Sequence, residues 1–235
     1  MTVSAHAGQM APISAIIAGD NALNAPFSTV SDGTLRQFNA KQHVFFEGDD
    51  RDSIYEVVEG VVCVYSIMAD GRRQVISFCY PGSLLGFGYA DSYLHNAETL
   101  SPTTLRCYSA SALETLATER PDLSQSLLSF MIAELSAARD QLLTLGRKSA
   151  PEKIASFLLD LSQHNRELGE DPAMLQLPMT RSDIGDYLGL TIETVSRNFT
   201  KLRSQGVIDL HQSSTVIILD MDSLEDIASC DEGNF

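Results

Sequence analysis

The chain has 235 residues, of which 44% are hydrophobic, and a formal net charge of −15 at neutral pH. That is enough apolar material for one large domain or two modest ones. No run of about 18 apolar residues could span a bilayer, and the start of the chain lacks the features of a signal peptide, so a membrane protein is excluded and a cytoplasmic location is expected.

Residues 1–30 are rich in Ala, Ser, Asn and Gly and show no sustained period, which predicts a flexible arm. Residues 31–120 carry short apolar or alternating runs between Gln42 and about Tyr108. Asp70-Gly71 is a favourable two-residue turn between two such runs. The pattern predicts a small antiparallel β-roll. Its turns are expected at Gly48, Gly60, Gly71, Gly82 and Gly86.

The cysteines indicate structural thiols rather than a metal site. Cys63, Cys79 and Cys107 lie in strand-like apolar runs, where burial is the favoured interpretation. Cys230 lies in a polar segment and is expected to be exposed. Because the sequence has no Cys-x-x-Cys and no close cluster, no metal ligand set is predicted.

A long helix is predicted over residues 121–145, with Pro121 in its first turn. Apolar residues repeat along it every seven positions, as the a and d positions of a parallel coiled coil do. A single amphipathic helix packed on its own domain has the same period. Of these two interpretations we favour the seam of a homodimer. The seam residues are Leu128, Met131, Leu135, Ala138, Leu142 and Leu145.

A second domain is predicted over residues 146–220, after a hinge at 146–151. Its first helix is expected from Glu152 to about Glu167. Two short β-runs, VIDL and TVIIL, indicate a two-stranded wing, and the tip between them has no Lys or Arg. Residues 221–235 form an acidic tail, in which we expect a short helix with a solvated end.

The segment from Thr180 to Gly206 predicts two short helices around a glycine turn. Thr180 and Asp183 have the spacing of a capping box, and Gly189 offers the positive φ of a turn. The second helix starts at Thr191 and ends near Gly206. Its inward face is predicted to be Ile192, Val195, Phe199 and Leu202, which leaves Glu193, Thr194, Ser196, Arg197 and Lys201 outward.

The outward face carries residues suited to the major groove. A guanine presents two acceptors to an arginine such as Arg197, and a cytosine presents an amino donor to a carboxylate such as Glu193. The alternative is a surface ion pair between these two residues, which lie four apart. Residues 146–206 hold eight Lys and Arg against eight Asp and Glu, while the rest of the chain is acidic. This distribution predicts specific, salt-sensitive binding to DNA.

The motif T-R-x-D-I-G-x-x-L-G, followed by E-T-V-S-R and a leucine, resembles the helix-turn-helix of the CRP/FNR transcription regulators. The resemblance implies an α+β fold: an N-terminal antiparallel β-roll similar to cyclic-nucleotide-binding domains, a long dimerisation helix and a C-terminal winged helix-turn-helix. It implies base reading by Glu193, Ser196 and Arg197. It also implies phosphate contacts from Thr180, Arg181, Thr191, Thr194 and Lys201.

Departures from the family pattern narrow the expectation. Ile192 and Ser196 replace an arginine and a glycine typical of the CRP branch, which favours the FNR branch, its FixK-type subgroup and half-sites of the TTGAT kind. Gly86-Phe87 and His95-Asn96 stand where cyclic-nucleotide binders carry Gly-Glu and Arg-Ser or Arg-Thr. A cyclic phosphate would lack its arginine, so cyclic AMP is not expected. The arm has no cysteine for an iron–sulfur cluster, and no cofactor is predicted.

The sequence therefore predicts a homodimeric activator that binds palindromic double-stranded DNA and RNA polymerase and, by its resemblance, controls low-oxygen or nitrogen-fixation genes. In one alternative the roll binds haem, nitric oxide or another small molecule, although a single loop histidine such as His95 is more often a surface residue. In another the chain is a ligand-binding or scaffold protein that does not act on DNA. No catalytic triad, metal cluster or phosphate loop is found in the sequence, so an enzyme is not predicted.

Overall fold

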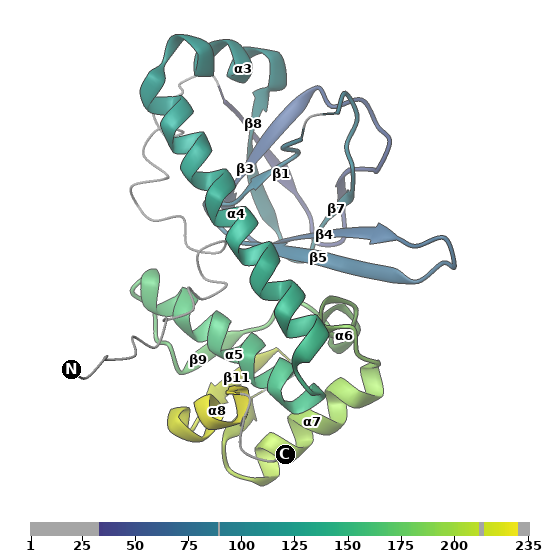
Figure 1. Cartoon of the computed structure of the whole chain (residues 1–235), viewed down its shortest axis with the longest axis vertical. Helices are drawn as coiled ribbons and strands as arrows, with labels where there is room; N and C mark the ends of the chain where they lie inside the picture. Colours follow the sequence, from purple (N-terminus) through teal and green to yellow (C-terminus); the bar gives the residue numbers. More distant parts are fainter. Residues whose placement is uncertain (1–32, 89, 212–213, 230–235) are drawn as a thin grey trace, which may run out of the picture.

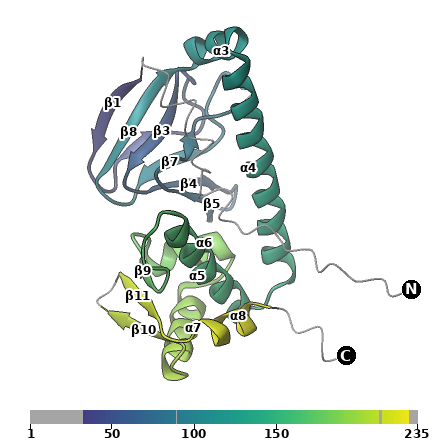
Figure 2. The ribbon, with the colours of Figure 1, turned by 90° about the vertical axis from the view of Figure 1, so that its left-hand side faces the viewer.

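The computed structural model of the chain describes residues 33–88, 90–211 and 214–229. The predicted arm of residues 1–30 and Cys230 lie outside the described residues. A β-roll occupies one end of the molecule and a smaller domain of helices and a short sheet occupies the other (Figure 1). One long helix, α4, runs from the roll to the smaller domain and connects the two (Figure 2).

Two four-stranded antiparallel sheets form the β-roll, with the strand orders β1-β8-β3-β6 and β2-β7-β4-β5. All five glycines predicted to turn the chain have positive φ. The first strand was not predicted, because four of its five residues are exposed and it carries no alternating apolar pattern. The strands are β1 (Thr34–Phe38), β2 (His43–Phe45), β3 (Ser53–Glu59), β4 (Val62–Ile67), β5 (Arg73–Cys79), β6 (Leu84–Leu85), β7 (Asn96–Thr99) and β8 (Thr103–Ser109).

The roll has its own core of buried apolar side chains, which includes Phe45, Val57 and Leu105. The prediction that Cys63, Cys79 and Cys107 are buried thiols is confirmed. Burial raises the pKa of the Cys79 thiol to about 12, so this thiol stays protonated at neutral pH.

A short helix that the sequence analysis missed, α3 (Ala110–Glu119), follows β8 directly. The hydroxyl of Ser109 caps it by accepting a hydrogen bond from the backbone N–H of Ala112. Leu113 of α3 and Leu123 of α4 are buried together with Ile54 and Tyr108 of the roll. The start of α4 is thereby fixed to the roll.

Helix α4 (Pro121–Arg147) has one side that is buried against the chain and one that is exposed. Leu123, Ala137 and Thr144 are buried against the rest of the chain. Only Lys148 and Ser149 separate α4 from α5 (Ala150–Glu167), so the break between the two helices is two residues long and not the six expected. Ser149 and Glu152 form a capping box that starts α5 immediately.

The smaller domain combines four helices with a three-stranded antiparallel sheet of order β10-β11-β9. Strands β10 (Ile208–His211) and β11 (Thr215–Ile218) are the predicted wing, and β9 (Met174–Gln176) adds a strand that was not predicted. Helix α8 (Met221–Ala228) buries Leu224 and Ala228. The short helix predicted in the tail is therefore present, and these two apolar residues, four positions apart, give it one packed face.

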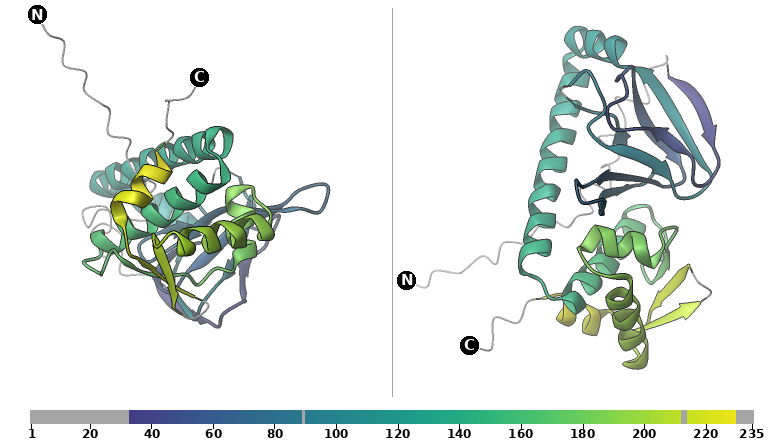
Figure 3. Two further views of the ribbon diagram at one scale, coloured as in Figure 1. Left: turned by 90° about the horizontal axis from the view of Figure 1, so that it is seen from below. Right: turned by 90° about the vertical axis from the view of Figure 1, so that its right-hand side faces the viewer.

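The largest apolar core is shared between the roll and the smaller domain. It includes Val75 and Phe78 of β5 together with Phe157 of α5 and Tyr187 of α6. The ring centroids of Phe78 and Tyr187 lie 5.2 Å apart. The end of the roll therefore packs directly on α5 and α6, and a side view shows that this end of the roll faces the helices of the smaller domain (Figure 3, right). No helix in the described part of the chain is long and apolar enough to cross a membrane.

Candidate nucleic-acid interface

Helices α6 (Arg181–Leu188) and α7 (Ile192–Ser204) form the predicted pair around a glycine turn. The backbone N–H of Asp183 donates to the Thr180 hydroxyl over 3.2 Å, and the backbone N–H of Thr180 donates to the Asp183 carboxylate over 2.8 Å. The predicted capping box is therefore present, and it fixes the first residue of α6.

Two glycines allow the sharp turn between α6 and α7. Gly189 caps α6 in the left-handed conformation, with φ of 64°. A Cβ atom placed on Gly185 would lie 2.6 Å from the carbonyl oxygen of Leu190. Only a residue without a side chain allows this close approach, which sets the angle between the two helices.

The inward face of α7 is Val195, Phe199 and Leu202, all of which are buried. Ile192 is 47% exposed, so its assignment to the inward face is wrong. Ile192 is the first residue of the helix and lies before the turn that packs on α6, which leaves its side chain largely exposed.

The three predicted base-reading residues, Glu193, Ser196 and Arg197, are all exposed on α7. Within the described part of the chain, neither Glu193 nor Arg197 has a hydrogen bond or ion pair from its side chain. The surface ion pair considered as the alternative does not form. These side chains are therefore available to bind another molecule.

The predicted phosphate contacts lie in different local environments. The hydroxyls of Thr191 and Thr194 lie 3.1 Å apart at the start of α7. The Thr180 hydroxyl donates to Asp183 over 2.6 Å, so its proton is already used in the cap. The guanidinium of Arg181 lies 3.5 Å from the centroid of the Phe199 ring, and burial lowers the pKa of this arginine. Lys201 is exposed on α7.

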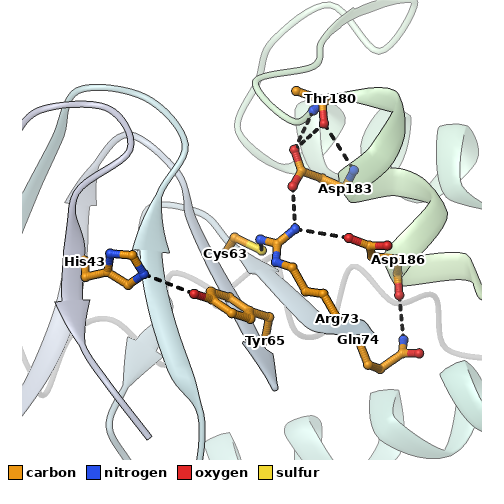
Figure 4. A network of polar contacts seen from close by, with 8 residues as sticks. All are labelled: His43, Cys63, Tyr65, Arg73, Gln74, Thr180, Asp183 and Asp186. Carbon is orange, nitrogen blue, oxygen red and sulfur yellow. Dashed lines mark hydrogen bonds and ion pairs between the residues drawn. The ribbon is translucent and has the colours of Figure 1, made fainter. Parts of the chain in front are cut away.

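A network from the roll holds α6 in place (Figure 4). Nη1 of Arg73, at the start of β5, lies 2.6 Å from Asp183 and 3.3 Å from Asp186. Nη2 of the same guanidinium donates to the sulfur of Cys63 over 3.2 Å. The amide of Gln74 donates to the backbone carbonyl of Asp186 over 2.7 Å. Arg73 and Gln74 were not predicted as site residues, because no local pattern in the sequence marks a contact across more than a hundred residues.

The last turn of α6 is held by two further side chains. Gln141 of α4 donates to the carbonyl of Tyr187 over 3.1 Å, and the Lys153 ammonium of α5 donates to the carbonyl of Leu188 over 3.1 Å. Carbonyls at a helix C-terminus have no partner within the helix. These two donors satisfy them and tie α6 to α4 and α5.

The carboxylate of Asp183 is charged although it is buried. Burial raises the pKa of Asp183, but hydrogen bonds from Thr180 and Arg73 outweigh this effect and hold the pKa below its ordinary value. The helix pair is thus attached to the roll by an ion pair that water largely does not reach.

Phe87 and His95, two of the residues that depart from the cyclic-nucleotide pattern, line a cavity of about 600 Å³ in the roll. Phe87 projects toward Phe130 of α4, with ring centroids 6.3 Å apart. His95 is half-buried rather than on the surface, and its Nδ1 lies 2.9 Å from the Ser66 hydroxyl. Burial lowers the pKa of His95, so the ring is neutral at pH 7. Arg51, which also lines the cavity, already donates to Ala90 and Glu114.

A β-roll joined by a long helix to a winged helix-turn-helix defines a DNA-binding regulator with a sensor-like domain. Two family comparisons match these parts: residues 35–120 match the cyclic nucleotide-binding domain, and residues 152–227 match the Crp-like helix-turn-helix domain. The chain belongs to the CRP/FNR family of transcription regulators and is of the FixK/FNR type.

Individual relatives agree with this assignment. The chain is 39% identical to the nitrogen fixation regulation protein FixK of Bradyrhizobium diazoefficiens over 197 residues, which cover 84% of this chain and 83% of the relative. It is 38% identical to the transcriptional activatory protein AadR of Rhodopseudomonas palustris over 73% of this chain and 72% of that protein. The solved structure of FixK2 from Bradyrhizobium japonicum superposes with a TM-score of 0.78 at 34% identity, over 84% of this chain and 98% of the other.

Proposed function

We propose that the protein acts as a homodimer that binds a palindromic operator with FNR-like half-sites of the TTGAT kind and activates transcription there. The observation that carries the proposal is the outer face of α7, where Glu193, Ser196 and Arg197 are exposed and Glu193 and Arg197 have no partner in the described part of the chain. Arg197 is assigned to a guanine, Glu193 to a cytosine amino group, and Ser196 to the neighbouring base. Thr180, Arg181, Thr191, Thr194 and Lys201 are proposed to contact phosphates.

The outer face of α4 supports the dimer. Large apolar residues that are more than half exposed follow one stripe of this helix, and a monomer in water gains nothing from such a stripe. Leu145, which was assigned to the seam, is half-buried at its edge, whereas Ile132 and Leu143 belong to the exposed stripe and were missed. The proposed seam is Leu128, Met131, Ile132, Leu135, Ala138, Leu142 and Leu143.

The physiological role is inferred from relatives. FixK is named a nitrogen fixation regulation protein, and AadR is named a transcriptional activatory protein. We extend both statements to this chain: it activates nitrogen-fixation or microaerobic genes, contacts RNA polymerase at the promoter, and does so in the cytoplasm, where the DNA is.

We further propose that DNA binding requires neither cyclic AMP nor an iron–sulfur cluster. The roll cavity has Phe87 and a neutral His95 in its wall, and its arginine, Arg51, is engaged by Ala90 and Glu114. A cyclic phosphate there would lack a free cationic partner. The volume of this cavity also supports a second candidate function, a regulator that responds to haem, nitric oxide or another small molecule in the roll.

The proposal is tested with the purified full-length protein and fluorescent duplexes. Anisotropy titrations compare a palindrome of two TTGAT-type half-sites with a scrambled duplex of equal composition, and sedimentation measures the mass of the complex. We expect selective binding by two copies of the chain, with an affinity that falls as salt rises. Equal affinity for both duplexes, or a complex with one copy per palindrome, would contradict the proposal. A visible absorption band in the purified protein would instead favour the second candidate.

A further inference from the structure

A second cavity, of about 390 Å³, lies where the roll, α4, α5 and α6 meet. It is separate from the cavity within the roll, although Ile76, Ser77 and Glu134 line both. Its walls are largely apolar: they include Phe78 and Phe157, and also Ala138 and Leu142, which belong to the proposed dimer seam as well. This volume suits a small organic molecule rather than a single ion.

Two residues that line this cavity, Tyr80 and Gln141, each carry a buried oxygen atom without a hydrogen-bond partner in the described chain, and Tyr80 also lines a neighbouring cavity beside His164. Tyr80 is only 7% exposed, and its hydroxyl has no partner in the described structure. The side-chain carbonyl of Gln141 is also buried and unpartnered. The amide nitrogen of Gln141 donates to the carbonyl of Tyr187, which fixes the amide orientation and leaves its oxygen without a donor. Buried polar groups without partners are rare and costly.

The same cavity contains two carboxyl groups and no basic side chain among its lining residues. Glu134 of α4 and Asp160 of α5 have no hydrogen bond or ion pair within the described chain. Burial raises the pKa of each to about 7. Near Asp160, Lys148 lowers its pKa and Asp140 raises it, but the Lys148 ammonium itself donates to Ser156.

We propose that this cavity binds a small organic cation with an apolar body, of the arylalkylamine class. The apolar walls would enclose the body. The ammonium group would donate to Asp160 and to the free oxygens of Gln141 and Tyr80, and Glu134 would add further negative charge. A neutral apolar molecule would leave these acceptors unpaired, and an anion would also be repelled by the carboxylates.

Because of its position, the cavity would couple its occupant to α6, the first helix of the helix-turn-helix. Gln74 and Gln141, which line it, also hold the carbonyls of Asp186 and Tyr187 in α6. A molecule that binds one position of α6 more tightly than another shifts the population toward that position. This effect on DNA affinity rests on the function proposed above, whereas the binding of a cation does not.

Binding is tested by calorimetric titration of the full-length protein at pH 7 without DNA. The probes are 2-phenylethylamine, its neutral analogue 2-phenylethanol and the anion phenylacetate. We expect the amine to bind at least about ten-fold more tightly than either analogue. Because a bound cation favours the ionised carboxyl groups, binding should release protons, which repetition in buffers of different ionisation enthalpy measures. Equal affinity for the three probes, or no saturable binding of the amine below about 10 mM, would overturn the proposal.

Variants locate the site. Asp160 lines this cavity and not the cavity of the roll, so Asp160→Asn should weaken amine binding at least about ten-fold. The control is Glu225→Gln, which makes the same change from carboxylate to amide on an exposed position of α8. Unchanged amine affinity in Asp160→Asn, or an equal loss in both variants, would place the amine elsewhere and refute the site. Operator affinity measured with and without the amine then tests the coupling separately.

Discussion

The guanidinium of Arg73 lies 2.6 Å from the carboxylate of Asp183, although the two residues are 110 positions apart in the sequence. Arg73 starts a strand of the roll, and Asp183 is the residue whose carboxylate caps the first helix of the DNA-binding motif. One carboxylate therefore serves both the local start of α6 and its attachment to the roll.

Replacement of Arg73 by alanine should reduce the free energy of unfolding by about 2–4 kcal/mol, because it leaves the Asp183 carboxylate buried without its cation. The neighbouring Arg72 is the matched control: it pairs with Asp70 on the surface, with 81% of its side chain exposed, so Arg72→Ala should change stability by less than about 0.5 kcal/mol. Urea titrations measure both. Equal losses in the two variants would contradict the structural role of Arg73.

The pH dependence of stability should report the buried Asp160. Its pKa of about 7 lies above the value near 4 of an unfolded chain, so the folded state holds a proton between these values that the unfolded state has lost. This group therefore makes the protein less stable as pH rises from about 4 to about 7. Burial lowers the pKa of His164 to about 4, so this group has the opposite effect: it makes the protein more stable as pH rises from about 4 to about 6.5.

Asp160→Asn removes this contribution and leaves that of His164. As pH rises from 5 to 8, the free energy of unfolding of the variant should increase by about 1–3 kcal/mol relative to that of the native chain, since one pKa unit corresponds to about 1.4 kcal/mol. Chemical unfolding at the two pH values measures the difference. Parallel pH profiles for the two proteins would show that Asp160 titrates normally.

Arg197→Ala should reduce discrimination between the proposed operator and a scrambled duplex by about 1–3 kcal/mol, because the guanine loses its bidentate partner. Lys201→Ala provides the comparison from the same helix. It should weaken binding to both duplexes alike and lower the salt dependence by about one counterion. An Arg197→Ala protein that keeps full discrimination would remove this residue from base reading.

Leu135→Asp should convert the proposed dimer to a monomer. The side chain is exposed on the outer stripe of α4, and two-fold symmetry places the substitution in the interface twice. The dissociation constant should rise at least about a hundred-fold. Ile67→Asp, at an exposed apolar position at the end of β4, is the control and should leave the mass unchanged. Sedimentation equilibrium distinguishes the outcomes, and a native chain that is already monomeric would refute the seam.

Local patterns in the sequence were sufficient for the elements that carry the candidate site. The capping box at Thr180, the glycine turn and the buried stripe of α7 follow from spacing alone, and each is present. Ile192 was misplaced because a period of 3.6 residues continues to the first residue of a helix, whereas packing on a neighbour begins only one turn later. Helix α3 was missed because only two of its residues, Ala110 and Leu113, are buried, and two residues are too few to show a helical period in the sequence.

Contacts between distant parts of the chain could not be predicted in this way. Arg73 and Gln74 follow a hairpin and look like solvated polar residues, and nothing near them in sequence marks α6 as their partner. Asp160 and Glu134 likewise lie on helices whose exposed faces contain many other charges. Their burial depends on how α4 and α5 are placed against the roll, which is a property of the tertiary structure.

The shared core of the roll and the smaller domain bears on how the chain can be divided. A cut at Lys148 would leave the DNA-binding half with the aromatic surfaces of Phe157 and Tyr187 in water, where Phe78 now covers them. Such exposed apolar patches cause association. The DNA-binding half is therefore a poor module for transplantation to another sensor, and a chimaera would have to bring β4 and β5 with it.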